Sequence, residues 1–146
     1  DAYIQLANLY AMEKHELAPL YYNNAIRIDS NSIESYYGRG LYHQSINEAK
    51  KAIKDYQDIL AIDSTYTDAY FNMGYVKLLL EEQPDTAEVL FNKAFSLDDK
   101  FFDALYMLGY AQELNGKPKV AAKTYRKVLE SVPDHLLAAK GVNRTE

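Results

Sequence analysis

Apolar residues recur along the chain at intervals of three and four, the spacing that places them on one face of an α-helix. One such stripe contains Tyr70, Met73, Gly74 and Leu78, and the next contains Ala87, Leu90, Phe91 and Ala94. The spacing predicts helices over residues 2–14, 17–29, 33–45, 48–62, 67–81, 85–97, 101–114 and 118–131, with a short final segment near 134–142. Because no alternation typical of β-strands interrupts the series, we predict an all-α fold.

Turn residues divide these helices into pairs. Asn115-Gly116 separates the helices of the last pair, and Asn47 occupies the equivalent place in the second pair, where Asn tolerates a left-handed backbone. Proline falls where the second helix of a pair should begin, a place at which its missing N–H does no harm. These prolines are Pro19, Pro84 and Pro118. The pattern therefore predicts four helical hairpins.

The hairpins are copies of one unit that repeats every 33 to 35 residues. Positions are numbered so that position two holds an acid in each copy: Asp1, Glu34, Asp68 and Asp103. Position eight then holds a small residue, which faces the second helix where a larger side chain would hold the two apart: Ala7, Gly40, Gly74 and Gly109. On the second helix, a ring follows four positions after a small residue in each copy: Tyr22, Tyr56, Phe91 and Tyr125. A period of this length indicates a solenoid, whose units bury their apolar faces against one another.

These residues resemble the tetratricopeptide repeat, a helix–turn–helix unit of about 34 residues. About 23 of 32 signature positions fit, over residues 1 to about 136. The resemblance implies a right-handed α-solenoid of four repeats, at about 1–32, 33–66, 67–101 and 102–135. Residues 136–146 would form a C-terminal cap or the start of a further helix, and 1–146 would be a single domain.

The second repeat departs from this signature. Arg39 stands where Leu is usual, His43 where Tyr is usual and Ile59 where Ala is usual. A buried Arg is costly unless it is paired, and Asp55 on the second helix is its natural partner. We therefore expect a structural Arg39–Asp55 ion pair; the alternative, in which Arg39 contacts a ligand, stays open. Gly38 has no explanation in the pattern.

Positions two, five, nine and twelve fall on one face of each first helix, and in tetratricopeptide proteins this face lines a concave groove that binds peptides. Rings occupy many of these positions, and aromatic side chains are favoured anchors at interfaces. The predicted partner-binding residues are Asn8, Tyr37, Leu41, Gln44, Phe71, Asn72, Tyr75, Leu78, Tyr106, Tyr110 and Glu113. The amides among them would hydrogen-bond the backbone of the partner. The alternative is that the rings pack between neighbouring repeats as ordinary core.

Charge and composition narrow the class of partner. A net charge of −5 without a basic stripe argues against nucleic acid. No apolar run approaches the roughly 20 residues that a membrane span needs. Chaperone-binding relatives grip an acidic C-terminal tail through Lys, Arg and Asn, but the matching positions here keep one Asn and no cation, so that ligand is not expected. The acids at position two either complement the helix dipole or form an acidic rim that prefers cationic or neutral peptides.

No catalytic, metal-binding or cofactor-binding group is expected. His15, His43 and His135 lie in different repeats, and the chain has no Cys. We therefore predict a non-enzymatic protein–protein interaction module that is a monomer or a weak homodimer. The alternative is a structural spacer or assembly element of a larger protein. Since the chain begins at Asp1 rather than Met, we expect a fragment of a longer protein, whose compartment the sequence leaves open.

Overall fold

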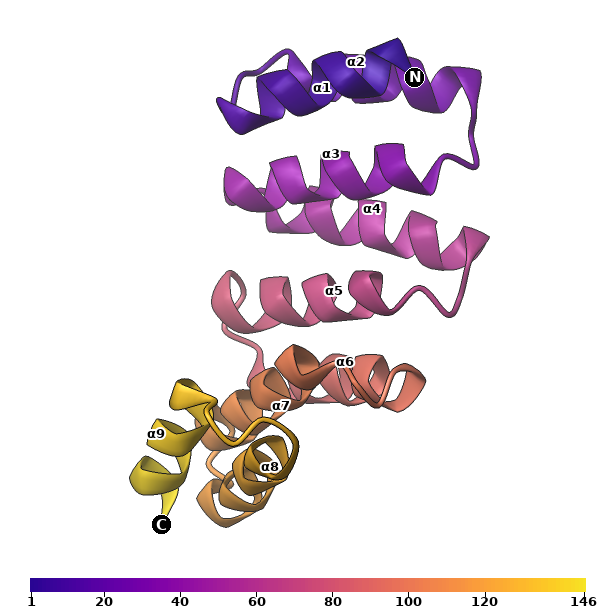
Figure 1. Ribbon diagram of the computed structural model, residues 1–146. Coiled ribbons are helices and arrows are strands. Elements are labelled where there is room, and N and C mark those ends of the chain that lie inside the picture. Colours follow the sequence, from indigo (N-terminus) through magenta and orange to yellow (C-terminus); the bar gives the residue numbers. More distant parts are fainter. The chain divides into compact units, whose positions relative to one another are not determined.

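The computed structural model describes residues 1–146, which form α-helices joined by short turns (Figure 1). The helices are α1 (Ala2–Met12), α2 (Ala18–Ile28), α3 (Ile33–Ser45), α4 (Ala49–Ile62), α5 (Thr67–Leu79), α6 (Pro84–Leu97), α7 (Phe102–Leu114), α8 (Pro118–Ser131) and α9 (Leu136–Thr145). The predicted all-α fold of four hairpins and a final helix is confirmed. The chain forms two compact units, Asp1–Ala69 and Tyr70–Glu146, and the boundary falls within α5. That the whole chain acts as a single domain stays a prediction.

Each unit is built from contacts between helices that follow one another in the chain. Within the first unit, α1 packs against α2, α2 against α3 and α3 against α4, and α1 also contacts α3. Within the second unit, α6, α7 and α8 each pack against the next helix, and α9 also contacts α7 (Figure 1). This succession of neighbour contacts is the arrangement of a helical repeat protein.

The ring on each second helix lies at the centre of its hairpin. At most 1% of the side-chain surface is exposed at Tyr22, Tyr56, Phe91 and Tyr125. A Cβ atom built on Gly40 would lie 2.7 Å from Tyr56 Cε1, and one built on Gly109 would lie 2.8 Å from Tyr125 Cε1. The small residue at position eight therefore lets the ring lie directly against the first helix, as predicted. Burying a large apolar side chain contributes about 1.5–3 kcal/mol to stability.

Each hairpin turns through one residue with a left-handed backbone. The φ angle is 53° at Lys14, 62° at Asn47, 53° at Glu82 and 72° at Gly116. Asn47 and Gly116 are the residues predicted for these turns, whereas Lys14 and Glu82 belong to types that disfavour this conformation. Helices α1 and α5 therefore end two residues earlier than predicted.

Helix starts follow the predicted chemistry. Helices α2, α6 and α8 each have proline in the first turn, as Pro19, Pro84 and Pro118. Helix α9 starts two residues later than predicted, because the Nδ1 atom of His135 accepts a hydrogen bond of 3.1 Å from the backbone N–H of Ala138 and caps the helix.

Candidate partner-binding face

In the first repeat, the predicted contact residue Asn8 is exposed on α1 and already has a partner within its own hairpin. The hydroxyl of Tyr22 donates a hydrogen bond of 2.5 Å to Asn8 Oδ1. Burial raises the pKa of Tyr22 to about 12, so this hydroxyl stays protonated and donates. The amide NH₂ of Asn8 remains the group that faces solvent.

In the second repeat, Tyr37 at position five is half-buried among rings. Its centroid lies 6.3 Å from that of Tyr56 and 6.0 Å from that of Tyr66. Leu41 at position nine is 38% exposed. Gln44 at position twelve accepts a 2.8 Å hydrogen bond from the hydroxyl of Tyr56 through Oε1. On this first-helix face, therefore, the ring of Tyr37 is packed, the side chain of Leu41 is accessible, and the amide oxygen of Gln44 is already hydrogen-bonded.

In the third repeat, the accessible part of the predicted face is smaller than expected. Phe71 is half-buried, with its ring 5.6 Å from that of Phe91 in an edge-to-face arrangement, and Tyr75 is half-buried as well. Asn72 is 8% exposed and Leu78 is 3% exposed. Leu78 belongs to the apolar core around Phe91, so a partner that lies on the surface has little of it to contact. The same holds for Asn72.

In the fourth repeat, the three predicted contact residues of α7 lie close to the buried ring of α8. The Tyr106 ring lies 5.7 Å from that of Tyr125 and 6.5 Å from that of Tyr110, to which it is parallel within 4°. It also lies 5.1 Å from the ring of His135, at the start of α9. Glu113 accepts a 2.7 Å hydrogen bond from the Tyr125 hydroxyl. Tyr106, Tyr110 and Glu113 thus form one surface within the second unit.

A rule connects position twelve to the ring on the second helix. In repeats two and four the ring is Tyr and position twelve is polar. In repeat three the ring is Phe and position twelve is Leu. The three pairs are Gln44–Tyr56, Glu113–Tyr125 and Leu78–Phe91. Burial raises the pKa of Tyr56 and of Tyr125, so both hydroxyls remain donors that need an acceptor. The match between position twelve and the ring can be seen in the sequence. From the sequence, however, Gln44 and Glu113 were predicted to face a partner.

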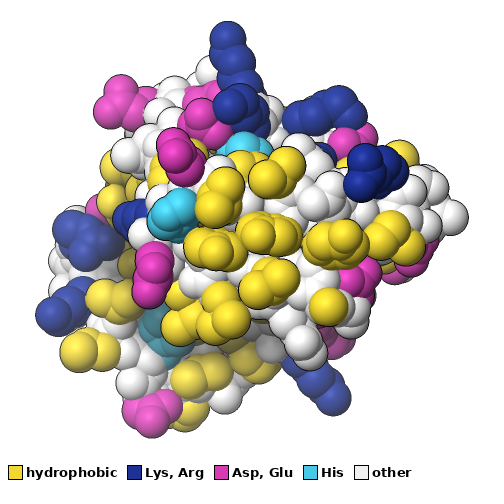
Figure 2. Space-filling view, turned by 90° about the horizontal axis from the view of Figure 1, so that it is seen from above, with side chains coloured by type: hydrophobic (Ala, Val, Ile, Leu, Met, Phe, Trp, Pro, Cys, Tyr) yellow, Lys and Arg dark blue, Asp and Glu magenta, His cyan; other side chains and the backbone are white.

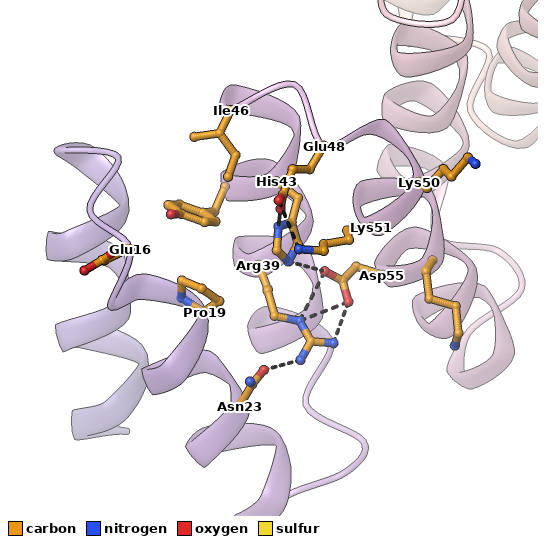
Figure 3. Close-up of a pocket in the computed structure, with 12 residues that line it drawn as sticks. Glu16, Pro19, Asn23, Arg39, His43, Ile46, Glu48, Lys50, Lys51 and Asp55 are labelled. Atoms are coloured by element: carbon orange, nitrogen blue, oxygen red, sulfur yellow. Dashed lines mark hydrogen bonds and ion pairs between the residues drawn. The ribbon is translucent and has the colours of Figure 1, made fainter.

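A second polar cluster lies on another side of the second repeat (Figure 3). Asp55 is 2% exposed, and its Oδ1 atom lies 2.6 Å from Nη2 of Arg39. The Nε atom of Arg39 donates to both carboxylate oxygens, at 3.1 and 3.2 Å, and Nη1 donates to Oδ1 of Asn23 on α2. The structure therefore brings Arg39 and Asp55 together, with Asn23 as a partner that the sequence did not indicate. That the pair has a structural role rather than a ligand-binding one stays a prediction.

His43 joins this cluster from the next turn of α3. Its Nδ1 atom lies 2.7 Å from Oε2 of Glu48, and its Nε2 atom lies 3.9 Å from Oδ2 of Asp55. Burial lowers the pKa of His43 despite the two carboxylates, and burial likewise raises the pKa of Asp55 against the opposing effect of Arg39. These side chains line a depression of about 700 Å³ between α2, α3 and α4 (Figure 3). The hydrogen-bonding groups of Arg39 and Asp55 contact one another at the edge of this depression.

The final helix contributes a residue to the fourth-repeat face that the sequence did not indicate. Arg144 of α9 donates from Nε to Oε1 of Glu113 at 2.6 Å and from Nη2 to Oε2 at 2.8 Å. Hydrogen bonds to the guanidinium and to Tyr125 lower the pKa of Glu113, so this carboxylate is ionised at neutral pH. Glu113 therefore has an oppositely charged neighbour from a helix that begins 22 residues later in the chain than α7 ends.

Two further properties bear on function. No group of three or more His, Asp or Glu side chains is arranged to hold a metal ion. None of the helices has both the length and the apolar character needed to cross a bilayer.

Comparison with protein families identifies the repeat. Two models, each described as tetratricopeptide repeat, match residues 33–66 and 103–135, which are the second and fourth hairpins. Among curated proteins, the chain is 27% identical over 143 residues to the human protein O-mannosyl-transferase TMTC3. The alignment covers 97% of this chain but 16% of the transferase, so the chain spans a small part of that relative.

Solved structures share this helical repeat fold. The chain superposes with a TM-score of 0.87 on MamA, at 20% identity, over 99% of this chain and 79% of that one. It superposes with a TM-score of 0.80 on YrrB, which is described as a TPR protein with an unusual peptide-binding site. That match has 27% identity and covers 98% of this chain and 74% of YrrB.

Proposed function

Since the chain belongs to the tetratricopeptide repeat family, we propose that it is a non-enzymatic interaction module that docks a segment of a partner protein on its first-helix faces. The contact residues would be Tyr37 and Leu41 in the first unit, and Phe71, Tyr75, Tyr106 and Tyr110 in the second. Asn8 and Gln44 would contribute the amide NH₂ groups that their bonds to tyrosine hydroxyls leave available. Glu113, whose oxygens are held by Tyr125 and Arg144, would contribute only where a partner replaces Arg144.

The proposal rests on a division among the aromatic side chains. The four rings at the centres of the hairpins are at most 1% exposed, whereas the rings at positions five and nine of the first helices are half-buried and reach the surface. A half-exposed Tyr combines apolar area with a hydroxyl, which suits an interface.

The structural relatives support the same class of function. YrrB, which shares the fold over nearly the whole of this chain, is described as having a peptide-binding site. The partner we propose here is a peptide or an extended or helical protein segment of neutral or cationic character. An acidic tail fits poorly, because the positions that hold Lys and Arg in chaperone-binding relatives carry no cation here.

The assembly alternative has one observation in its favour. On α1, Leu6, Leu9 and Met12 are 40, 63 and 83% exposed. Leu9 stands at position ten, where Tyr42 in the second repeat is 5% exposed because α1 and α2 cover it. Hydrophobic side chains gather on this end of the first unit, which Figure 2 views end-on. An apolar surface of this kind is typical of an interaction site, here with a further helix or a second copy.

A photo-crosslinking experiment tests the proposed face. A benzophenone side chain would replace Tyr110 in one variant and Val120, which is 46% exposed on the second helix α8, in the matched control. We expect native lysate to give defined adducts from the Tyr110 position that a Tyr75→Ala change in the same protein removes, and none of these from Val120. Identical adducts from both positions would contradict the proposal. The assembly alternative replaces the proposal under two conditions: the Tyr110 position gives no adducts, and the protein self-associates in a way that Leu9→Asp abolishes.

A further inference from the structure

Glu113 occupies a place where its charge is not required by the fold. Its hydrogen bond to the Tyr125 hydroxyl measures 2.7 Å, and in the second repeat the neutral amide of Gln44 accepts the equivalent bond from Tyr56 at 2.8 Å. A Gln therefore suffices for the buried hydroxyl. A carboxylate costs more to bury partly than an amide unless a cation pairs with it. The negative charge of Glu113 therefore interacts with a group other than the Tyr125 hydroxyl.

The structure shows which group the site accepts. Arg144 holds both carboxylate oxygens of Glu113 through two parallel hydrogen bonds of 2.6 and 2.8 Å, the fork geometry that matches a guanidinium to a carboxylate. The ring of Tyr106 is parallel to that of Tyr110, and Tyr106 is close enough to Arg144 and Glu113 for their charges to act on its hydroxyl. Tyrosine faces attract guanidinium groups, so the carboxylate and the rings suit the same cation.

The resident guanidinium is partly open to solvent. The side chain of Arg144 is 47% exposed, whereas that of Glu113 is 18% exposed. An exposed ion pair contributes modestly to stability, although two-bond geometry such as this raises its contribution. The attachment of α9 itself depends on other contacts, since Ala138 is fully buried and the backbone at Gly141 lies against the ring of Tyr125. Arg144 can therefore swing away from Glu113 without releasing the helix.

We propose that the fourth-repeat face is an arginine-recognition site, in which a guanidinium from a partner segment displaces Arg144 from Glu113 and lies against Tyr106 and Tyr110. Arg144 is then a built-in competitor that occupies the site until a partner arrives. This inference rests on the proposed function, because it presupposes that the first-helix face of the second unit binds a peptide. It adds the chemical class of the side chain that is selected.

Two pools of short peptides test the site. Both vary Tyr, Leu, Ala and Ser at the outer positions, and they differ only in a central Arg or a central citrulline, its neutral isostere. Binding to isotope-labelled protein would be followed by NMR at the tyrosines of the second unit. In the Arg144→Gln protein, whose Glu113 has no resident guanidinium, we expect the Arg pool to bind more tightly than the citrulline pool by about two- to fivefold, the factor that corresponds to one exposed ion pair. In the natural sequence the same preference should be smaller, because the peptide must first displace Arg144.

Three variants define the outcome. Arg144→Gln should tighten binding of the Arg pool by a similar factor, because it removes the competitor. Glu113→Gln should bind both pools equally, with the Tyr125 hydroxyl still satisfied by the new amide. Arg126→Gln removes an exposed arginine of α8 that pairs with Glu146, and it should bind the pools as the natural sequence does.

The results separate this inference from the function on which it rests. If both pools bind equally to every form and shift the tyrosine signals, the face binds peptides but the arginine site is wrong. If neither pool binds, the peptide-binding proposal fails together with the arginine site. If Arg144→Gln and Glu113→Gln lower the midpoint of thermal unfolding equally and leave pool preference unchanged, the pair is a helix staple and the inference is overturned.

Discussion

A Cβ atom built on Gly38 would lie 2.6 Å from Cε1 of Tyr22, so the first helix of the second repeat rests directly on the ring of the repeat before it. The sequence pattern offered no reason for Gly38, because the constraint comes from a neighbouring hairpin. At the other end of the chain, a Cβ on Gly141 would lie 2.5 Å from Cε2 of Tyr125. The same contact thus docks α9 on the fourth repeat, which makes α9 equivalent to the first helix of a further hairpin.

Gly38→Ala should destabilise the protein even though alanine favours helix formation. The gain in helix propensity is about 1 kcal/mol, but overpacking against a buried ring costs about 1–3 kcal/mol. We expect the free energy of unfolding, measured by urea denaturation, to fall by up to about 2 kcal/mol. Gln5→Ala is the control, because Gln5 stands at the same position of α1 and is exposed. A Gly38→Ala variant more stable than the parent would contradict the contact.

The hydroxyl partnership of Gln44 and Tyr56 predicts strong coupling between the two residues. Gln44→Leu alone leaves a buried hydroxyl without its acceptor and should cost about 1–3 kcal/mol. The double variant Gln44→Leu/Tyr56→Phe recreates the pairing of Leu78 with Phe91 in the third repeat, so it should recover most of that loss. A double-mutant cycle by chemical denaturation measures the coupling. Additive effects would show that the hydrogen bond has no energetic role.

The Arg39–Asp55 pair predicts a similar asymmetry with larger values. Arg39→Met leaves Asp55, which is 2% exposed, as an unpaired buried carboxylate, and we expect a loss of about 3–5 kcal/mol. Arg39→Met/Asp55→Leu copies Met73 and Leu90, which occupy these positions in the third repeat, and should be far closer to the parent in stability. If the double variant is as unstable as the single one, the pair contributes something that apolar packing does not replace.

His43 should make the first unit sensitive to mildly acidic pH. Its pKa in the folded state is lowered by burial from the ordinary value of 6.5, so the unfolded chain binds a proton at higher pH than the folded chain. Stability should therefore fall as the pH drops below about 6.5 towards the folded-state pKa. In His43→Gln, which places the residue of Gln112 at the equivalent position, this part of the pH dependence should disappear. Urea midpoints across that range give the measurement, and parallel curves for the two proteins would contradict the assignment.

The helices could be predicted closely because their signals are local. Apolar spacing at 3.6 residues per turn, proline at the start of α6 and α8, and Asn47 or Gly116 in the turns all act within a few residues. The ends of α1 and α5 were less predictable, since Lys14 and Glu82 adopt a left-handed backbone against their own preference. There the packing of the hairpin decides the turn, and a local reading of the sequence misses it.

The partner-binding face could be predicted only in part, because several of its side chains are claimed by contacts distant in sequence. Gln44 and Glu113 do lie on the first helices, but buried tyrosine hydroxyls use their oxygen atoms. Leu78 lies on the same series of positions yet is core. Arg144 joins the face from 31 residues away. Helical periodicity indicates the direction of a side chain, but it does not show which neighbour already occupies that direction.

The pairing of each buried second-helix tyrosine with an acceptor on its own first helix has a consequence for how such chains diversify. Because Asn8, Gln44 and Glu113 each serve the tyrosine of the same hairpin, duplication or exchange of a whole hairpin transfers donor and acceptor together. A crossover inside a hairpin would separate them and leave a hydroxyl stranded in the interior. Recombination at the boundaries between hairpins is therefore the route by which new arrays of this type can arise without losing stability, and chimaeras built for binding should be joined there.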